Sequence, residues 1–339
     1  MIIAKINNEN KIHIDGQLVG ELKGLKFIIE VTSKTLDTDI KSIKKAARKG
    51  IEKELIKRTN EILDKGEIEL NNENKISWKG NPIGRLKKGN DYLNPEIDII
   101  ADDALNEESK LKLLKFLSKW LNGYINDLLG DLIKLTKHKI TNQYLRGLVF
   151  QLYEKNGVIK RRDVEKIVKL IPTEERKKLW GMGIKIGRYH IYLPKMLKPK
   201  AVEFRIRLWG IFHNLSINKQ IPKSGLNFLL NENFDKNFYL LCGFEKFKDF
   251  FVRIDILEKL FLKIIEVTKD KKFKVSSEMM NLLGCSKENF YKLMSYMDYK
   301  KDKALDTYVF KGEKKKKEKI IRFDKKENPF NKLLSLNIK

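Results

Sequence analysis

Apolar residues recur along most of the chain at spacings that predict helices joined by short strands. Apolar positions three and four residues apart mark one face of a helix, whereas alternating positions mark a half-buried strand. In the first 66 residues, short apolar segments broken by glycines predict a β-hairpin, because glycine adopts the positive φ that tight turns require. A helix is expected next, with one apolar stripe formed by Ile43, Ala47, Ile51, Leu55 and Ile62.

The same pattern returns with a constant offset of 64 residues, from Asn10 to Asn74. An Asn-Lys-Ile triplet, two glycines and a Leu-Lys pair recur in register. We therefore predict two β-hairpin-plus-helix repeats, at residues 1–66 and 67–138. The second helix is expected to lie deeper, because its apolar stripe is wider and includes Leu113, Phe116, Leu117, Trp120, Leu121, Tyr124 and Leu128.

Residues 139–220 predict a helical domain that contains one bulged β-strand at 184–193. The apolar side chains of this strand change face at Gly187, which predicts a β-bulge or a tight kink there. Residues 221–252 are less regular and are expected to form a connecting segment with short strands. The bulge would keep one face apolar and bring four side chains together on the solvent-facing side, namely Lys185, Arg188, His190 and Tyr192.

Residues 253–323 predict a winged-helix-like domain, with a basic tail at 324–339. Ser276 and Ser286 are expected to cap its second and third helices, with Gly284 in the turn between them. The third helix should turn a core face inward, formed by Phe290, Leu293, Met294 and Met297. Its outward face would then carry Lys287, Tyr291 and Lys292.

A basic hairpin is expected after the third helix. A strand at 307–310 and a return strand at 319–323 would flank its tip, which carries Lys314, Lys315, Lys316 and Lys317. Lysines beside a recognition-type helix suit contacts with a phosphate backbone. The whole chain is thus expected to be α+β and predominantly helical.

The net charge is +26, from 71 Lys and Arg against 45 Asp and Glu. A cationic excess of this size attracts polyanions, since binding releases the counterions condensed on nucleic acid. Nucleic acid is therefore the expected partner, with a merely solvated basic surface as the alternative.

Catalytic chemistry is not indicated. No glycine-rich loop ends in Lys-Ser or Lys-Thr, so the chain should not bind and hydrolyse ATP. The close acidic pairs, such as Glu174 and Glu175, fall at expected helix starts, where the helix dipole explains them. Cys242 and Cys285 are the only cysteines, and neither they nor the scattered histidines have metal-ligand spacing. We expect no cofactor, no metal and no membrane segment, in a cytoplasmic protein.

Several segments resemble the C-terminal accessory region of alphaproteobacterial superfamily II RNA helicases, which are related to the mitochondrial degradosome helicase. The most distinctive are Gly-Arg-Tyr-His-Ile-Tyr-Leu-Pro at 187–194 and Leu-Leu-Gly-Cys-Ser at 282–286. The resemblance covers most of residues 10–300 and implies RNA handling beside a motor. The motor domains of the family would precede residue 1, so a separately encoded motor is expected, with a fragment as the alternative. Further matching segments lie at 76–80, 82–86, 146–152, 197–199, 208–209 and 252–258.

The sequence thus predicts a non-catalytic RNA-binding accessory module that uses the bulged strand, the third helix and the basic hairpin. The alternatives are a protein-interaction scaffold and a double-stranded DNA-binding regulator. The sequence also favours core positions for Trp78, Trp120, Trp180 and Trp209 over stacking on bases.

Overall fold

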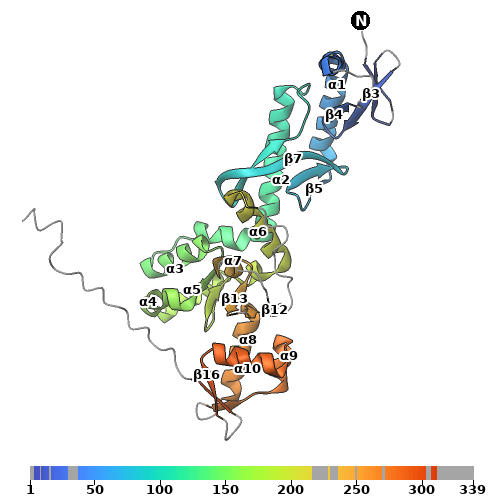
Figure 1. Cartoon of the computed structure of the whole chain (residues 1–339). Helices are drawn as coiled ribbons and strands as arrows, with labels where there is room; N and C mark the ends of the chain where they lie inside the picture. Colours follow the sequence, from blue (N-terminus) through green and yellow to red (C-terminus); the bar gives the residue numbers. More distant parts are fainter. Residues whose placement is uncertain are drawn as a thin grey trace, which may run out of the picture.

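The computed structural model describes residues 4–7, 9–14, 17–29, 37–215, 228–229, 236–248, 250–268, 272–302 and 307–310, with side chains in the first helix described from residue 50. These residues form an α+β structure with several small antiparallel sheets, which confirms the predicted α+β class. The sheets follow one another from one end of an elongated molecule to the other (Figure 1).

The N-terminal unit is a four-stranded antiparallel sheet followed by a long helix. Four consecutive strands pair in chain order where a two-stranded hairpin was expected. Ile12 and Leu22 of the sheet are buried together with Ile51, Leu55 and Ile62 of the helix. The elements are β1 (Ala4–Ile6), β2 (Lys11–Ile14), β3 (Gln17–Lys23), β4 (Lys26–Ile29) and α1 (Asp37–Lys65).

The next unit has the same order of elements and shares local backbone geometry with the first. Ile12 pairs with Gly20 and Ile76 pairs with Gly84, and a register shift follows each isoleucine. The residues at 10 and 74 are both asparagines with positive φ, 63° and 61°. The elements of this unit are β5 (Ile68–Leu70), β6 (Lys75–Trp78), β7 (Asn81–Asp91), β8 (Asn94–Ile99) and α2 (Glu107–Lys134).

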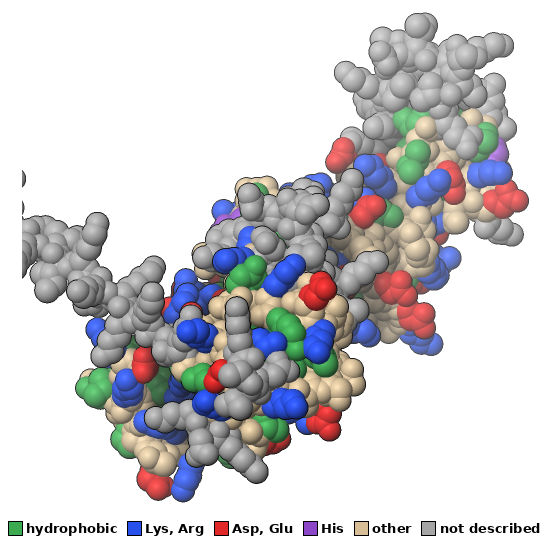
Figure 2. All heavy atoms as spheres, turned by 60° about the horizontal axis from the view of Figure 1, so that its bottom comes forward, with side chains coloured by type: hydrophobic (Ala, Val, Ile, Leu, Met, Phe, Trp, Pro, Cys, Tyr) green, Lys and Arg blue, Asp and Glu red, His purple; other side chains and the backbone are tan. Residues whose placement is uncertain are grey.

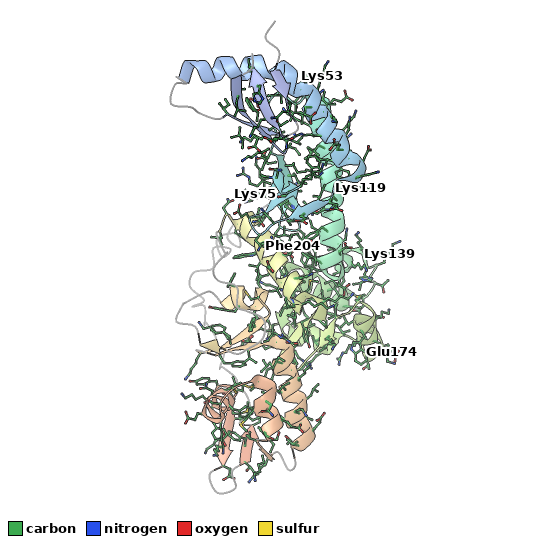
Figure 3. All side chains as sticks on the ribbon, turned by 90° about the vertical axis from the view of Figure 1, so that its right-hand side faces the viewer. Lys53, Lys75, Lys119, Lys139, Glu174 and Phe204 are labelled. Atoms are coloured by element: carbon green, nitrogen blue, oxygen red, sulfur yellow. The ribbon has the colours of Figure 1, made fainter. Side chains whose placement is uncertain are left out.

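The central region is mainly helical and contains a three-stranded sheet. The aromatic ring of Phe204 meets that of Tyr124 edge to face, with 5.1 Å between their centroids, and so joins α6 to α2 (Figure 3). Its elements are η1 (Leu135–Lys137), α3 (Gln143–Glu154), β9 (Val158–Lys160), η2 (Arg161–Val164), α4 (Glu165–Leu170), α5 (Thr173–Gly181), β10 (Lys185–Ile186), β11 (His190–Tyr192), η3 (Pro194–Leu197) and α6 (Pro199–His213).

The expected bulged strand at 184–193 is instead a tight hairpin, so that prediction is wrong. β10 and β11 pair antiparallel with each other, Lys185 opposite Tyr192 and Ile186 opposite Ile191. The Gly187 amide donates to the His190 carbonyl oxygen at 2.7 Å and closes the turn. The apolar residues change from even to odd positions at Gly187 because the chain reverses there. Ile186 and Ile191 are paired across the hairpin and so share one face, as they would on either side of a bulge.

The segment after α6 carries a small sheet that packs on this helix. Tyr239 and Phe251 are buried against Ile206, and Arg205 is buried beside them. Arg205 donates to the backbone carbonyls of Asn156 and Leu241, which ties α6 to both neighbouring segments. The elements are β12 (Phe228–Leu229), α7 (Lys236–Leu241), β13 (Phe244–Phe247) and β14 (Phe250–Arg253), with sheet order β12-β14-β13.

The C-terminal region places three helices against a three-stranded sheet of order β15-β17-β16. Ser276 and Ser286 accept hydrogen bonds from Met279 and Asn289, so both predicted caps are present. The predicted core face of the third helix is buried, namely Phe290, Leu293, Met294 and Met297. The elements are α8 (Ile254–Val267), β15 (Lys272–Lys274), α9 (Ser277–Leu283), α10 (Lys287–Tyr296), β16 (Tyr299–Asp302) and β17 (Thr307–Phe310).

The predicted strand at 307–310 is present, but its hairpin partner differs from the expected one. β17 pairs with β16 on one side and with β15 on the other. Both edges of β17 are therefore occupied by strands that precede it in the chain. Residues 312–323, including Lys314 to Lys317, lie outside the described residues. Within the described part of the chain, none of the helices combines the length and the apolar character needed to cross a bilayer.

Candidate nucleic-acid interface

The turn between β10 and β11 is built around the carboxylate of Glu258 on α8. Three consecutive backbone amides donate to this carboxylate, those of Arg188 at 2.6 Å and of Tyr189 and His190 at 2.9 Å each. A Cβ at residue 187 would overlap the carboxylate. Gly187 is thus required by the close approach of a side chain from another part of the chain. The carboxylate fixes the turn and the direction in which Arg188 leaves it.

His190 lies buried between two carboxylates. Its Nε2 is 2.9 Å from Glu245 Oε2 and its Nδ1 is 3.4 Å from Glu258 Oε1, and Lys160 forms an ion pair with Glu245. Burial lowers the pKa of His190, but the hydrogen bonds and charges of the two glutamates outweigh it and place the pKa above its ordinary value. Burial raises the pKa of Glu245, but His190 and Lys160 lower it by more. The pKa therefore lies below its ordinary value, and the carboxylate keeps its charge.

The four side chains that were expected to share one exposed face differ in burial, although Lys185 and Tyr192 are paired in the hairpin. Lys185 and Arg188 are exposed, whereas His190 and Tyr192 are buried. His190 is buried because it has charged partners inside the protein, and Tyr192 is buried because it packs in a small apolar cluster with Val158, Leu197 and Ile254. Arg188 and Lys185 remain available to a ligand.

Arg188 lies where two hollows of the surface meet. Its guanidinium carbon lies 5.6 Å from the centre of the Phe261 ring on α8. The first hollow, which we call the basic cleft, has a volume of about 390 Å³ and lies beside η2, β13 and the end of α10. Its charged lining consists of Lys160, Arg161, Arg162, Glu165, Arg188, His190, Glu245, Lys246 and Asp298.

Acidic side chains in the basic cleft are largely occupied by other residues. Glu245 is bound by Lys160 and His190, and Glu165 forms an ion pair of 2.7 Å with Lys169. The other cationic side chains of the cleft, those of Arg161, Arg162, Arg188 and Lys246, can attract an anion to it. In Figure 2, Lys and Arg side chains are spread over this C-terminal end of the molecule.

The second hollow, which we call the tryptophan groove, has a volume of about 810 Å³ and lies between α5, the β10–β11 hairpin and α8. Trp180 lines it with 77% of its surface exposed. Trp180 was expected in the core, and this prediction is wrong. Trp78 is buried and Trp120 and Trp209 are half-buried, as expected for core positions. The sequence indicates only that Leu179 and Trp180, which point about 100° apart on α5, cannot both face the core; the structure buries Leu179.

The predicted outward face of α10 lies apart from both hollows. Lys287 and Lys292 are exposed, while Tyr291 is half-buried against Tyr308, with 5.9 Å between their ring centroids. The ammonium of Lys301 lies 4.7 Å above the Tyr291 ring. None of these side chains lines the basic cleft or the tryptophan groove.

Neither a metal site nor a comparison with known proteins assigns a function to the described residues. Among the described residues, no group of three or more His, Cys, Asp and Glu side chains is arranged to hold a metal ion. Burial raises the pKa of the Cys242 thiol to about 12, so this cysteine is kept in its neutral form.

No family model, no curated protein and no solved structure matches the chain.

Proposed function

We propose that the chain is a non-catalytic RNA-binding accessory module and that the surface around Arg188 binds the RNA. The observation that supports this most is the position of Arg161 and Arg188, which line both the basic cleft and the tryptophan groove. Glu258, which also lines the tryptophan groove, is engaged by the amides of the β10–β11 turn. A strand of RNA laid across Arg188 could therefore meet cations in both hollows.

The arrangement of the C-terminal region supports the same proposal. The order helix, strand, helix, helix and two strands, with the first strand beside the last, is typical of winged helices, which often bind nucleic acid. We infer that residues 253–310 form such a domain, and that the two N-terminal units are copies of one ancestral unit. The resemblance to the helicase accessory region supports a role beside a helicase motor.

A protein-interaction scaffold is the second candidate, favoured by an apolar strip on α8. Leu262 and Ile265 expose 58% and 53% of their surfaces, and Phe310 lies nearby along the same hollow as Ile265. Such a strip could dock a partner protein, and contacts of this kind depend little on salt.

Binding of labelled single-stranded RNA, duplex RNA and duplex DNA at two salt concentrations tests the proposal. We expect RNA binding that weakens steeply with salt, and no ATP hydrolysis. Arg188→Ala should weaken RNA binding, whereas Arg146→Ala removes the same charge from an exposed position on α3 and should not. Failure to bind any nucleic acid at low salt would favour the scaffold, and a preference for duplex DNA would favour a DNA regulator.

A further inference from the structure

Trp180 is the most exposed large apolar side chain among the described residues. It lies in the last turn of α5, where the Gly183 amide donates to the Trp180 carbonyl oxygen at 2.9 Å and Gly183 adopts a φ of 77°. Its neighbour Leu179 fills the core position and is completely buried. The indole is thus held on the surface by the backbone around it. Figure 3 shows α5, on which Glu174 is labelled, at the edge of the molecule.

An indole exposed to this extent leaves a large apolar surface in water, which is unfavourable unless a ligand covers it. The surroundings indicate the chemistry of that ligand. Cations from three elements line the tryptophan groove, with Arg161 on η2, Lys185 on β10 and Lys259 on α8. An aromatic face bordered by cations is typical of proteins that bind single-stranded nucleic acid, in which bases stack and phosphates contact Lys and Arg.

We propose that the indole of Trp180 stacks on an unpaired nucleobase, and that the tryptophan groove binds single-stranded RNA. Lys185 and Arg188 then contact the phosphates on either side of the stacked base. A duplex offers no such contact, since each base inside it is already covered above and below by its neighbours. This inference rests on the proposed RNA-binding function and specifies which form of RNA the site accepts.

A protein ligand fits the groove less well. Leu262 lies beside Trp180 among the exposed apolar side chains of the groove, but the charged lining is mainly cationic, with Arg161, Lys185, Arg188 and Lys259 against Asp255 and Glu258. Asp255 is engaged by Arg253 in an ion pair of 2.6 Å. The apolar strip that suits a protein partner starts at Leu262, at the border of the groove, and continues along α8 to Ile265, near Phe310 of β17.

The test compares Trp180→Ala and Trp180→Phe with Phe150→Ala. Phe150 is a matched control, because it is an aromatic residue on α3 with 61% of its surface exposed and lines neither hollow. Binding is measured by fluorescence anisotropy with a 12-nucleotide oligouridylate, an oligomer of the same length with abasic sites, and an RNA duplex. Melting temperatures confirm that every variant is folded.

We expect Trp180→Ala to weaken oligouridylate binding by roughly 5- to 150-fold, the range for one stacked base, without changing the salt dependence. Trp180→Phe should recover most of the affinity, because phenylalanine keeps an aromatic face. The abasic oligomer should bind the parent and Trp180→Ala equally. Phe150→Ala should behave like the parent.

Three results would overturn the inference, and they differ in what they imply for the proposed function. If Trp180→Ala binds oligouridylate like the parent while Arg188→Ala binds it weakly, the stacking is refuted and RNA binding stands. If the parent binds none of the three probes at low salt, the stacking and the RNA-binding function both fall. Equal affinity of the parent for duplex and single strand would also overturn the stated ligand class.

Discussion

The carboxylate of Glu258 accepts a hydrogen bond from the backbone amide of His190, with 2.9 Å between Oε1 and the nitrogen. The two residues are 68 positions apart in the chain, and their contact joins the β10–β11 hairpin to α8. The same carboxylate binds the amides of Arg188 and Tyr189. One buried acidic side chain therefore determines where Arg188 lies between the two hollows.

Gly187→Ala should destabilise the protein, because the added methyl group displaces the Glu258 carboxylate from the turn. The loss should be at least roughly 1.5 to 3 kcal/mol, the value of one of the three charge-assisted hydrogen bonds that the carboxylate accepts, as measured by urea unfolding. Gly147→Ala is the control, since nothing lies within 4 Å of its added methyl group on α3. The control should be neutral or slightly stabilising, and a Gly187→Ala variant as stable as the parent would contradict the role of Glu258.

The charge of His190 should make stability depend on pH. Its pKa is raised above the ordinary value of 6.5 in the folded chain, so its contribution is complete below pH 6.5 and is lost as pH rises through the raised pKa. The loss is at most about 1.4 kcal/mol per pH unit, the value for one proton. The melting temperature of the parent should therefore fall as pH rises above 6.5. His190→Gln should remove this fall, whereas His138→Gln, at an exposed position, should retain it.

Glu245 should act on the acidic side of the same profile. Its pKa is lowered below the ordinary value of 4.5, so its contribution is complete above pH 4.5 and is lost as pH falls through the lowered pKa. Glu245→Gln should therefore be less stable than the parent at pH 6 and should lose less stability between pH 6 and pH 3. If the parent and Glu245→Gln lost the same free energy of unfolding between pH 6 and pH 3, the proposed contribution of the Glu245 carboxylate would be contradicted.

Arg162 and Arg188 should each neutralise one RNA phosphate. The double replacement by Ala should reduce the slope of log affinity against log salt by about 1.4, which is about 0.7 for each phosphate of a single strand. Both side chains are exposed, so the melting temperature should change little. An unchanged slope with weaker binding would show that these arginines act through the shape of the cleft.

Arg205→Ala should destabilise the central region without removing any residue that lines the two hollows. The guanidinium is completely buried, and burial lowers its pKa to about 10. Its loss leaves the carbonyls of Asn156 and Leu241 without this donor and should cost roughly 2 to 5 kcal/mol in the free energy of unfolding. RNA affinity measured well below the melting temperature should stay near that of the parent.

The sequence by itself determined the elements whose signals are local. The core face of α10, the caps at Ser276 and Ser286, and the α+β class follow from spacing and from residues within one turn of each other. The recurrence of the Asn10 pattern at Asn74 also predicted positions that share backbone geometry. Such features need no knowledge of distant contacts.

Only the tertiary structure decided the candidate site. A bulged strand and a hairpin at 184–193 give the same alternation of apolar residues, and the choice between them depends on Glu258, far away in the sequence. The burial of His190 depends in the same way on Glu245 and Glu258, which give a charged imidazole partners inside the protein. Trp180 is exposed because α5 places Leu179 against the core. Contacts between distant residues set these positions, and a one-dimensional pattern carries no record of them.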